Sequence, residues 1–147
     1  MSRPVDVDVT RDMKASAPAI WAVLEDLSRL PEWLAFAASL PERSGDRVEP
    51  GATYTVKPEH GYEPQTHWRV TAVQDRRQVH ESEMPMISGV VSTIEVNEGA
   101  DGRASTHVHW RGEPSTLMGR AMRPMFQRQI TSNWKKSLEA LDRAAGG

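Results

Sequence analysis

The chain has 147 residues, of which 38% are hydrophobic and 26% are charged, and it contains no cysteine. This length suits one globular domain over residues 1–147, and a chain without cysteine forms no disulfide bond and uses no thiolate chemistry. No apolar run approaches the roughly 18 residues that a membrane span needs, and the first ten residues lack the apolar core of a signal peptide. We therefore expect a cytoplasmic protein with no integral membrane association.

The formal net charge of −2 is unevenly distributed along the chain. Residues 1–114 carry 12 basic and 18 acidic side chains, whereas residues 115–147 carry six basic and two acidic ones. A basic surface attracts anionic partners. The alternative is an ordinary solvated helix face, which is favoured because polar residues separate the arginines.

The first part of the chain reads as one strand followed by two helices. Residues 5–10 alternate between valine and polar side chains, as in a half-buried strand. Ser16 suits a helix N-cap and Pro18 the first helical turn, so a helix is predicted from here to about residue 28. A second short helix is predicted to open at Pro31 and to close before Pro41. It carries Trp33, Leu34 and Phe36.

Beyond residue 41 the chain consists of short alternating segments separated by turn residues. Trp68, Val70 and Ala72 share one predicted strand face, and Trp110 is expected to face inward on another strand by the same parity. Hairpins in series predict an antiparallel meander, and strands segregated from helices predict an α+β protein. The predicted strands of this series cover residues 52–57, 65–74, 78–84, 87–96 and 103–111.

Residues 115–145 have the spacing of a long helix with one apolar and one basic side. Such a helix is roughly 45 Å long and needs a large partner surface, so a curved sheet is expected to face it. Pro124 either kinks this helix or lies in the first turn of a separate one. Because Gly119 and three methionines fall within residues 117–125, we interpret this segment as a movable lid over a pocket.

Four stretches carry a resemblance to a known family. They are Ser-Ala-Pro at 16–18 followed by Ile-Trp-Ala-Val-Leu at 20–24, Asp-Leu-Ser-Arg-Leu-Pro-Glu-Trp at 26–33, Thr-His-Val-His-Trp at 106–110, and Trp-Lys-Lys-Ser-Leu-Glu-Ala-Leu at 134–141. With them the chain resembles the START-like superfamily (SRPBCC, helix-grip fold), and within it most closely the polyketide cyclase/dehydrase group. The resemblance spans residues 5–145.

The resemblance implies an α+β helix-grip fold. In that fold a curved seven-stranded antiparallel sheet surrounds a long C-terminal helix, and two short helices lie at one end. It also implies a hydrophobic cavity between sheet and helix. Similar proteins bind lipids, polyketides, hormones or aromatic metabolites, and a minority catalyse cyclisation or dehydration. No catalytic residue is carried over from the family.

Strand parity singles out His80 as the one titratable side chain expected inside the cavity. An imidazole with a pKa near 6.5 can act as an acid, a base or a polar anchor, and the alternative is a structural or rim histidine. Arg69 is a further polar candidate, although its parity points it outward. The residues predicted to bind ligand are Trp33, Tyr54, Trp68, Ser82, Val90, Trp110, Met118, Met122 and Phe126.

Other chemistries have little support in the sequence. His67, His107 and His109 could form a zinc site, but the parity that places the tryptophans inward points these histidines to solvent, so no metal is expected. No nucleophile elbow, phosphate loop or basic-aromatic platform is present, so we expect no cofactor and no nucleic-acid partner.

Three hypotheses of function follow. The first is binding or carriage of a hydrophobic small molecule such as a lipid, polyketide or aromatic metabolite. The second is a cyclase or dehydratase that uses the same cavity with His80 as acid or base. The third is a module that contacts a partner through the basic helix face. The sequence specifies neither the ligand nor the oligomeric state.

Overall fold

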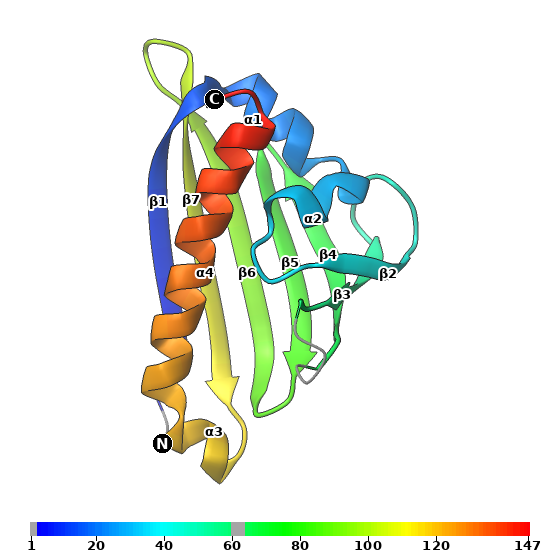
Figure 1. The fold of residues 1–147 in the computed structure, drawn as a ribbon, viewed down its shortest axis with the longest axis vertical. Coiled ribbons are helices and arrows are strands. Elements are labelled where there is room, and N and C mark those ends of the chain that lie inside the picture. The colour runs from blue at the N-terminus through cyan, green and yellow to red at the C-terminus, as the bar shows by residue number, and fades with distance from the viewer. Residues whose placement is uncertain (1–2, 60–63) are drawn as a thin grey trace.

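The computed structural model describes residues 3–59 and 64–147, and within them seven antiparallel strands form one curved sheet (Figure 1). The spatial order is β1-β7-β6-β5-β4-β3-β2, so β1 and β2 are the edge strands. This confirms the predicted α+β helix-grip architecture. The strands are β1 (Val5–Ser16), β2 (Ser39–Arg43), β3 (Thr53–Lys57), β4 (Thr66–Gln74), β5 (Arg77–Met84), β6 (Ile87–Glu98) and β7 (Arg103–Pro114).

The N-terminal strand is longer than predicted, and the helix after it is shorter. The pairing of β1 with β7 shifts register between Asp12 and Ser16, and this irregularity carries the strand up to the first helix. The Ser16 hydroxyl accepts a hydrogen bond from the Ala19 amide, which confirms the predicted N-cap of α1 (Ala17–Leu24). A separate 3₁₀ turn, η1 (Leu27–Arg29), then begins after Asp26, whose side chain accepts from the Ser28 amide.

The second helix differs most from the prediction. Helix α2 (Leu30–Trp33) has only four residues, because the backbone turns to an extended conformation at Leu34. The Ala35 amide then donates to the Ser137 hydroxyl on the C-terminal helix at 2.8 Å, so a tertiary contact takes the place of the next helical turn. Phe36 therefore lies in a loop. Pro41, predicted to close the helix, lies in edge strand β2, where a missing amide proton is tolerated.

Two β-bulges change which side chains face the helix. The β4–β5 pairing shifts register between Val70 and Ala72, so Ala72 is exposed and its predicted inward position is wrong. On β6 a shift between Ser88 and Val91, with Gly89 at φ +59°, buries both Ile87 and Val90. A bulge inserts one extra residue and reverses the parity beyond it, which an alternating pattern does not reveal.

The predicted long helix is two helices, α3 (Leu117–Ala121) and α4 (Arg123–Ala144). Pro124 lies in the first turn of α4, which confirms the second of the two alternatives for this proline. In α4 the expected apolar side is buried at Trp134, Leu138 and Leu141. In contrast, Leu117 and Met118 on α3 are 81% and 61% exposed.

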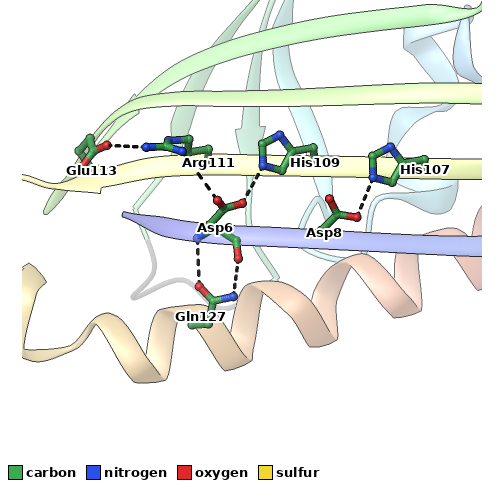
Figure 2. Close-up of polar contacts among 7 residues, drawn as sticks. All are labelled: Asp6, Asp8, His107, His109, Arg111, Glu113 and Gln127. Carbon is green, nitrogen blue, oxygen red and sulfur yellow. Dashed lines mark hydrogen bonds and ion pairs between the residues drawn. The ribbon is translucent and has the colours of Figure 1, made fainter. Parts of the chain in front are cut away.

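Helix α4 crosses the concave face beside β1 and β7 (Figure 1) and is hydrogen-bonded to the free edge of β1 at two points. Near its C-terminus the buried Asp142 carboxylate accepts from the amides of Lys14 and Ala15 at 3.0–3.1 Å. Near its N-terminus the Gln127 side-chain amide accepts from the Asp6 amide and donates to the Asp6 carbonyl (Figure 2). These contacts satisfy edge groups that no strand covers.

The Asp142 contact is expected to contribute strongly to stability. Asp142→Ala leaves two amides without their charged acceptor, one of them on the buried Ala15, and should lower the free energy of unfolding by about 2–4 kcal/mol. Urea denaturation measures this loss. Glu139→Ala is the matched control, because Glu139 is exposed on the same helix with only a 3.7 Å ion pair to Arg11. It should change stability by less than about 0.5 kcal/mol, and equal losses in the two variants would contradict the assignment.

Candidate functional site

A mostly apolar cavity of about 240 Å³ lies between the sheet and the first turns of α4. Its lining includes residues of the β5–β6 turn, and this turn and α3 are at the same end of the molecule (Figure 1). The predicted ligand-binding residues Trp110 and Phe126 line it, and Pro85 and Met86 form part of its wall. The full lining comprises Phe36, Val56, Pro58, Pro64, Thr66, Met84, Pro85, Met86, Ile87, Trp110, Phe126, Gln129, Ile130 and Asn133.

Deeper in the concave face, aromatic side chains fill the space that the resemblance implied to be hollow. Trp33 packs against Trp134 with ring centroids 6.4 Å apart, and Tyr54 stacks on Trp68 at 6.3 Å. A second, inner cavity of only about 10 Å³ remains among them. The predicted ligand-binding residues Trp33, Tyr54 and Trp68 thus line this small inner space rather than the larger outer one.

His80 also lines the inner cavity, and both of its ring nitrogens are hydrogen-bonded to buried side chains. The Gln78 amide nitrogen donates to the Leu24 carbonyl at 2.9 Å, so its oxygen faces His80 Nε2 at 3.0 Å as an acceptor. Nε2 therefore carries the proton. Nδ1 in turn accepts from the Tyr54 hydroxyl at 2.7 Å. Partner chemistry alone thus determines the tautomer.

Burial in this apolar setting lowers the pKa of His80 from 6.5 to about 4 and raises the pKa of the Tyr54 phenol. His80 is consequently neutral near pH 7, and protonating Nδ1 would remove the acceptor that Tyr54 uses. A general acid or base needs a nitrogen within reach of the substrate. The catalytic assignment of His80 stays a prediction, and this geometry favours its alternative as a structural histidine.

The other predicted site residues lie outside both cavities. The Ser82 hydroxyl donates to the His67 carbonyl at 2.6 Å, and Val90 is fully buried in the core. Met122 is half-buried where α3 meets α4, and Met118 is exposed on α3. Arg69 is exposed on the convex face, as its parity suggested. Their roles in ligand binding, and the mobility of the segment 117–125, stay predictions.

The other three described histidines, His67, His107 and His109, lie on the convex face and contact nearby polar groups. His107 and His109 on β7 are 2.7 Å and 2.6 Å from the carboxylates of Asp8 and Asp6 on β1 (Figure 2). His67 is hydrogen-bonded to Thr55 at 2.9 Å. Over residues 3–59 and 64–147, no group of three or more acidic or histidine side chains is arranged to hold a metal ion.

A larger depression of about 510 Å³ lies over β2, β3 and β4, and most of its lining side chains are charged or polar, such as Glu42, Arg43 and Glu81. Among the predicted site residues, Tyr54, Trp68 and Arg69 also line it. Its polar walls make it a poor site for an apolar ligand. We therefore take the 240 Å³ cavity as the candidate site.

Of the helices described, none has the length and hydropathy needed to cross a membrane.

Sequence reasoning missed several residues of the outer cavity. Gln129 and Asn133 line it beside Phe126 and Ile130, at helical spacings of three and four residues. The sequence did contain a signal for these two residues, because Gln129 and Asn133 carry side-chain amides on a helix face that is otherwise apolar. Phe36 was assigned to a helix, whereas the loop held by Ser137 places it on the wall of both cavities.

Comparison with known proteins identifies the class that this fold and cavity suggest. The model of the family described as polyketide cyclase / dehydrase and lipid transport matches residues 4–146, and the chain belongs to this family. No curated protein matches it.

Solved structures share the fold at low sequence identity. A protein from Thermobifida fusca is 18% identical with a TM-score of 0.75, over 97% of this chain and 93% of that one. A protein of unknown function from Staphylococcus aureus is 15% identical with a TM-score of 0.76, over 99% and 95%. The di-domain ARO/CYC StfQ from the steffimycin biosynthetic pathway is 12% identical with a TM-score of 0.76, over 97% of this chain and 51% of that one. Identities this low establish a shared fold alone.

The lowered pKa of His80 predicts a specific pH dependence of stability. Between pH 6.5 and about 4 the unfolded chain binds a proton that the folded chain does not. Stability from this group is therefore complete above pH 6.5 and is lost as pH falls toward 4, by roughly 3 kcal/mol. Urea denaturation at pH 7.5, 6, 5 and 4 measures the free energy of unfolding of the wild type and of His80→Gln. This free energy should fall more steeply with decreasing pH in the wild type than in His80→Gln. His107→Gln, on the convex face, should follow the wild type, and parallel curves for His80→Gln and the wild type would refute the prediction.

Proposed function

We propose that this protein binds a hydrophobic small molecule in the outer cavity between sheet and α4. The observation that carries the proposal is the apolar cavity of about 240 Å³ between the sheet and the first turns of α4. Pockets that hold small ligands are mostly apolar with a few polar groups that orient the ligand. Thr66, Gln129 and Asn133 supply such groups here. The description of the family, which includes lipid transport, supports the same interpretation.

Binding is favoured over acid–base catalysis because none of the described side chains that line the outer cavity is titratable. His80, the candidate acid or base, lies behind the aromatic layer with both nitrogens engaged. The alternative, an enzyme, draws on the family description and on the fold shared with StfQ, an ARO/CYC protein. It would be supported by turnover that His80→Gln abolishes while ligand affinity is kept.

Filling the cavity should abolish binding. N-phenyl-1-naphthylamine, a neutral apolar dye that fluoresces in apolar surroundings, is expected to bind the wild type. Ile130→Trp places a larger side chain in the cavity and should weaken this binding at least about tenfold, because the dye loses the apolar surface it would cover.

Met125→Trp is the matched control, since Met125 is on the same helix, 45% exposed and outside the lining. It should bind the dye like the wild type. Thermal unfolding of each variant confirms that the fold is intact. Absence of dye binding by the folded wild type, or equal binding by Ile130→Trp, would overturn the proposed function.

A further inference from the structure

Three side chains that line the inner cavity each carry a buried polar atom with no hydrogen-bond partner among the described residues. The atoms are the indole nitrogens of Trp33 and Trp134 and the hydroxyl oxygen of Ser92. The three side chains are only 2–3% exposed, and all of them line the same space of about 10 Å³. An unpaired buried polar atom is unusual and costly. Three of them around one small space indicate a site for a polar atom.

The chemistry of these atoms defines what they can bind. Each indole N–H can only donate a hydrogen bond, and the Ser92 hydroxyl can also donate. Tyr54 and His80, which line the same space, already use their polar atoms on each other and on Gln78. The complement is therefore a hydrogen-bond acceptor. It is a neutral one, because the described lining contains no cation to pair with a buried carboxylate.

Size and position connect this site to the outer cavity. A space of about 10 Å³ is near the lower limit for a single water-sized atom, so it suits one oxygen and not a larger group. Phe36 lines both cavities, and its ring meets the edge of Trp134 with centroids 6.0 Å apart. Phe36 is half-buried in a loop, and among the described residues it is the one that lines both cavities.

We propose that the inner cavity binds the neutral acceptor oxygen of the ligand, such as a ketone oxygen, while the apolar body of the ligand occupies the outer cavity and the Phe36 ring turns aside. Trp33, Trp134 and Ser92 then select apolar molecules that carry a carbonyl at one end over pure hydrocarbons. The inference rests on the proposed function, because it assigns the orientation of the ligand in that site.

Two nearly isosteric probes test this selection, 2-acetylnaphthalene and 2-isopropenylnaphthalene, which differ only by a carbonyl oxygen in place of a CH₂ group. Their affinities are measured by displacement of N-phenyl-1-naphthylamine. The alkene is the more hydrophobic probe, so a cavity without donors binds it more tightly. With the donors engaged, the wild type should instead prefer the ketone by about fivefold or more.

Substitutions assign the preference to the inner cavity. Ser92→Ala removes one donor with little change in shape and should lower the ratio of ketone to alkene affinity by about threefold or more. Trp33→Phe removes an indole N–H and should lower the ratio further. Using the ratio cancels the loss of packing that affects both probes.

Thr106→Val is the matched control. The Thr106 hydroxyl is also buried and without a described partner, but it lines neither cavity. This variant should keep the wild-type ratio.

The possible failures are distinct. Suppose that the wild-type protein binds the dye, that Ile130→Trp weakens this binding, and that the wild type nevertheless prefers the alkene. This result leaves the proposed function intact and overturns the inference about the inner cavity. Ratios that are the same in Ser92→Ala, Trp33→Phe and the wild type overturn it as well, and would assign the inner space to a water molecule. Lack of dye binding overturns the proposed function itself.

Discussion

The attachment of α4 to the edge of β1 is the contact on which the rest of the structure depends. Asp142 and Gln127 use side-chain carboxylate and amide groups to pair backbone atoms of a strand that has no neighbour on that side. An open strand edge is a template for aggregation, and here the helix covers part of it. The same contacts hold α4 over β1 and β7, so other segments must cover the rest of the concave face (Figure 1).

The cavity arises because α4 covers only part of the concave face and other segments cover the rest. At one end α2 and the loop after it bring Trp33 and Phe36 against Trp134, and the Ser137 hydroxyl holds this loop to α4 at 2.8 Å from the Ala35 amide. Close aromatic packing leaves almost no free volume there. At the other end the first turns of α4 face strand residues such as Trp110 and the β5–β6 turn, and the 240 Å³ cavity remains between them. The candidate site is thus placed where the aromatic layer stops.

Much of this arrangement could be predicted from residue patterns, and the failures have physical causes. Period-two alternation located the strands and the inward faces of Trp68 and Trp110. It failed at Ala72, because a bulge reverses parity without a clear mark in the sequence. Parity also placed His80 inside, and Gln78 lies two positions before it on the same face of β5. The other partner, Tyr54, lies on β3, and strand alternation alone does not show which residues of distant strands meet.

By itself the sequence determined the α+β class, the family resemblance, most of the strand faces and an irregularity of the long helix near Pro124, because each depends on local chemistry or on the order of segments. Tertiary structure alone decided which of the inward aromatics fill the core and which border empty space, since that depends on side chains from distant segments meeting. Trp33 and Trp110 were both predicted to bind ligand, yet one lines a 10 Å³ space and the other a 240 Å³ cavity. The contacts of α2 and the following loop with α4 place Trp33 in the packed aromatic layer, whereas Trp110 on β7 lies where that layer ends.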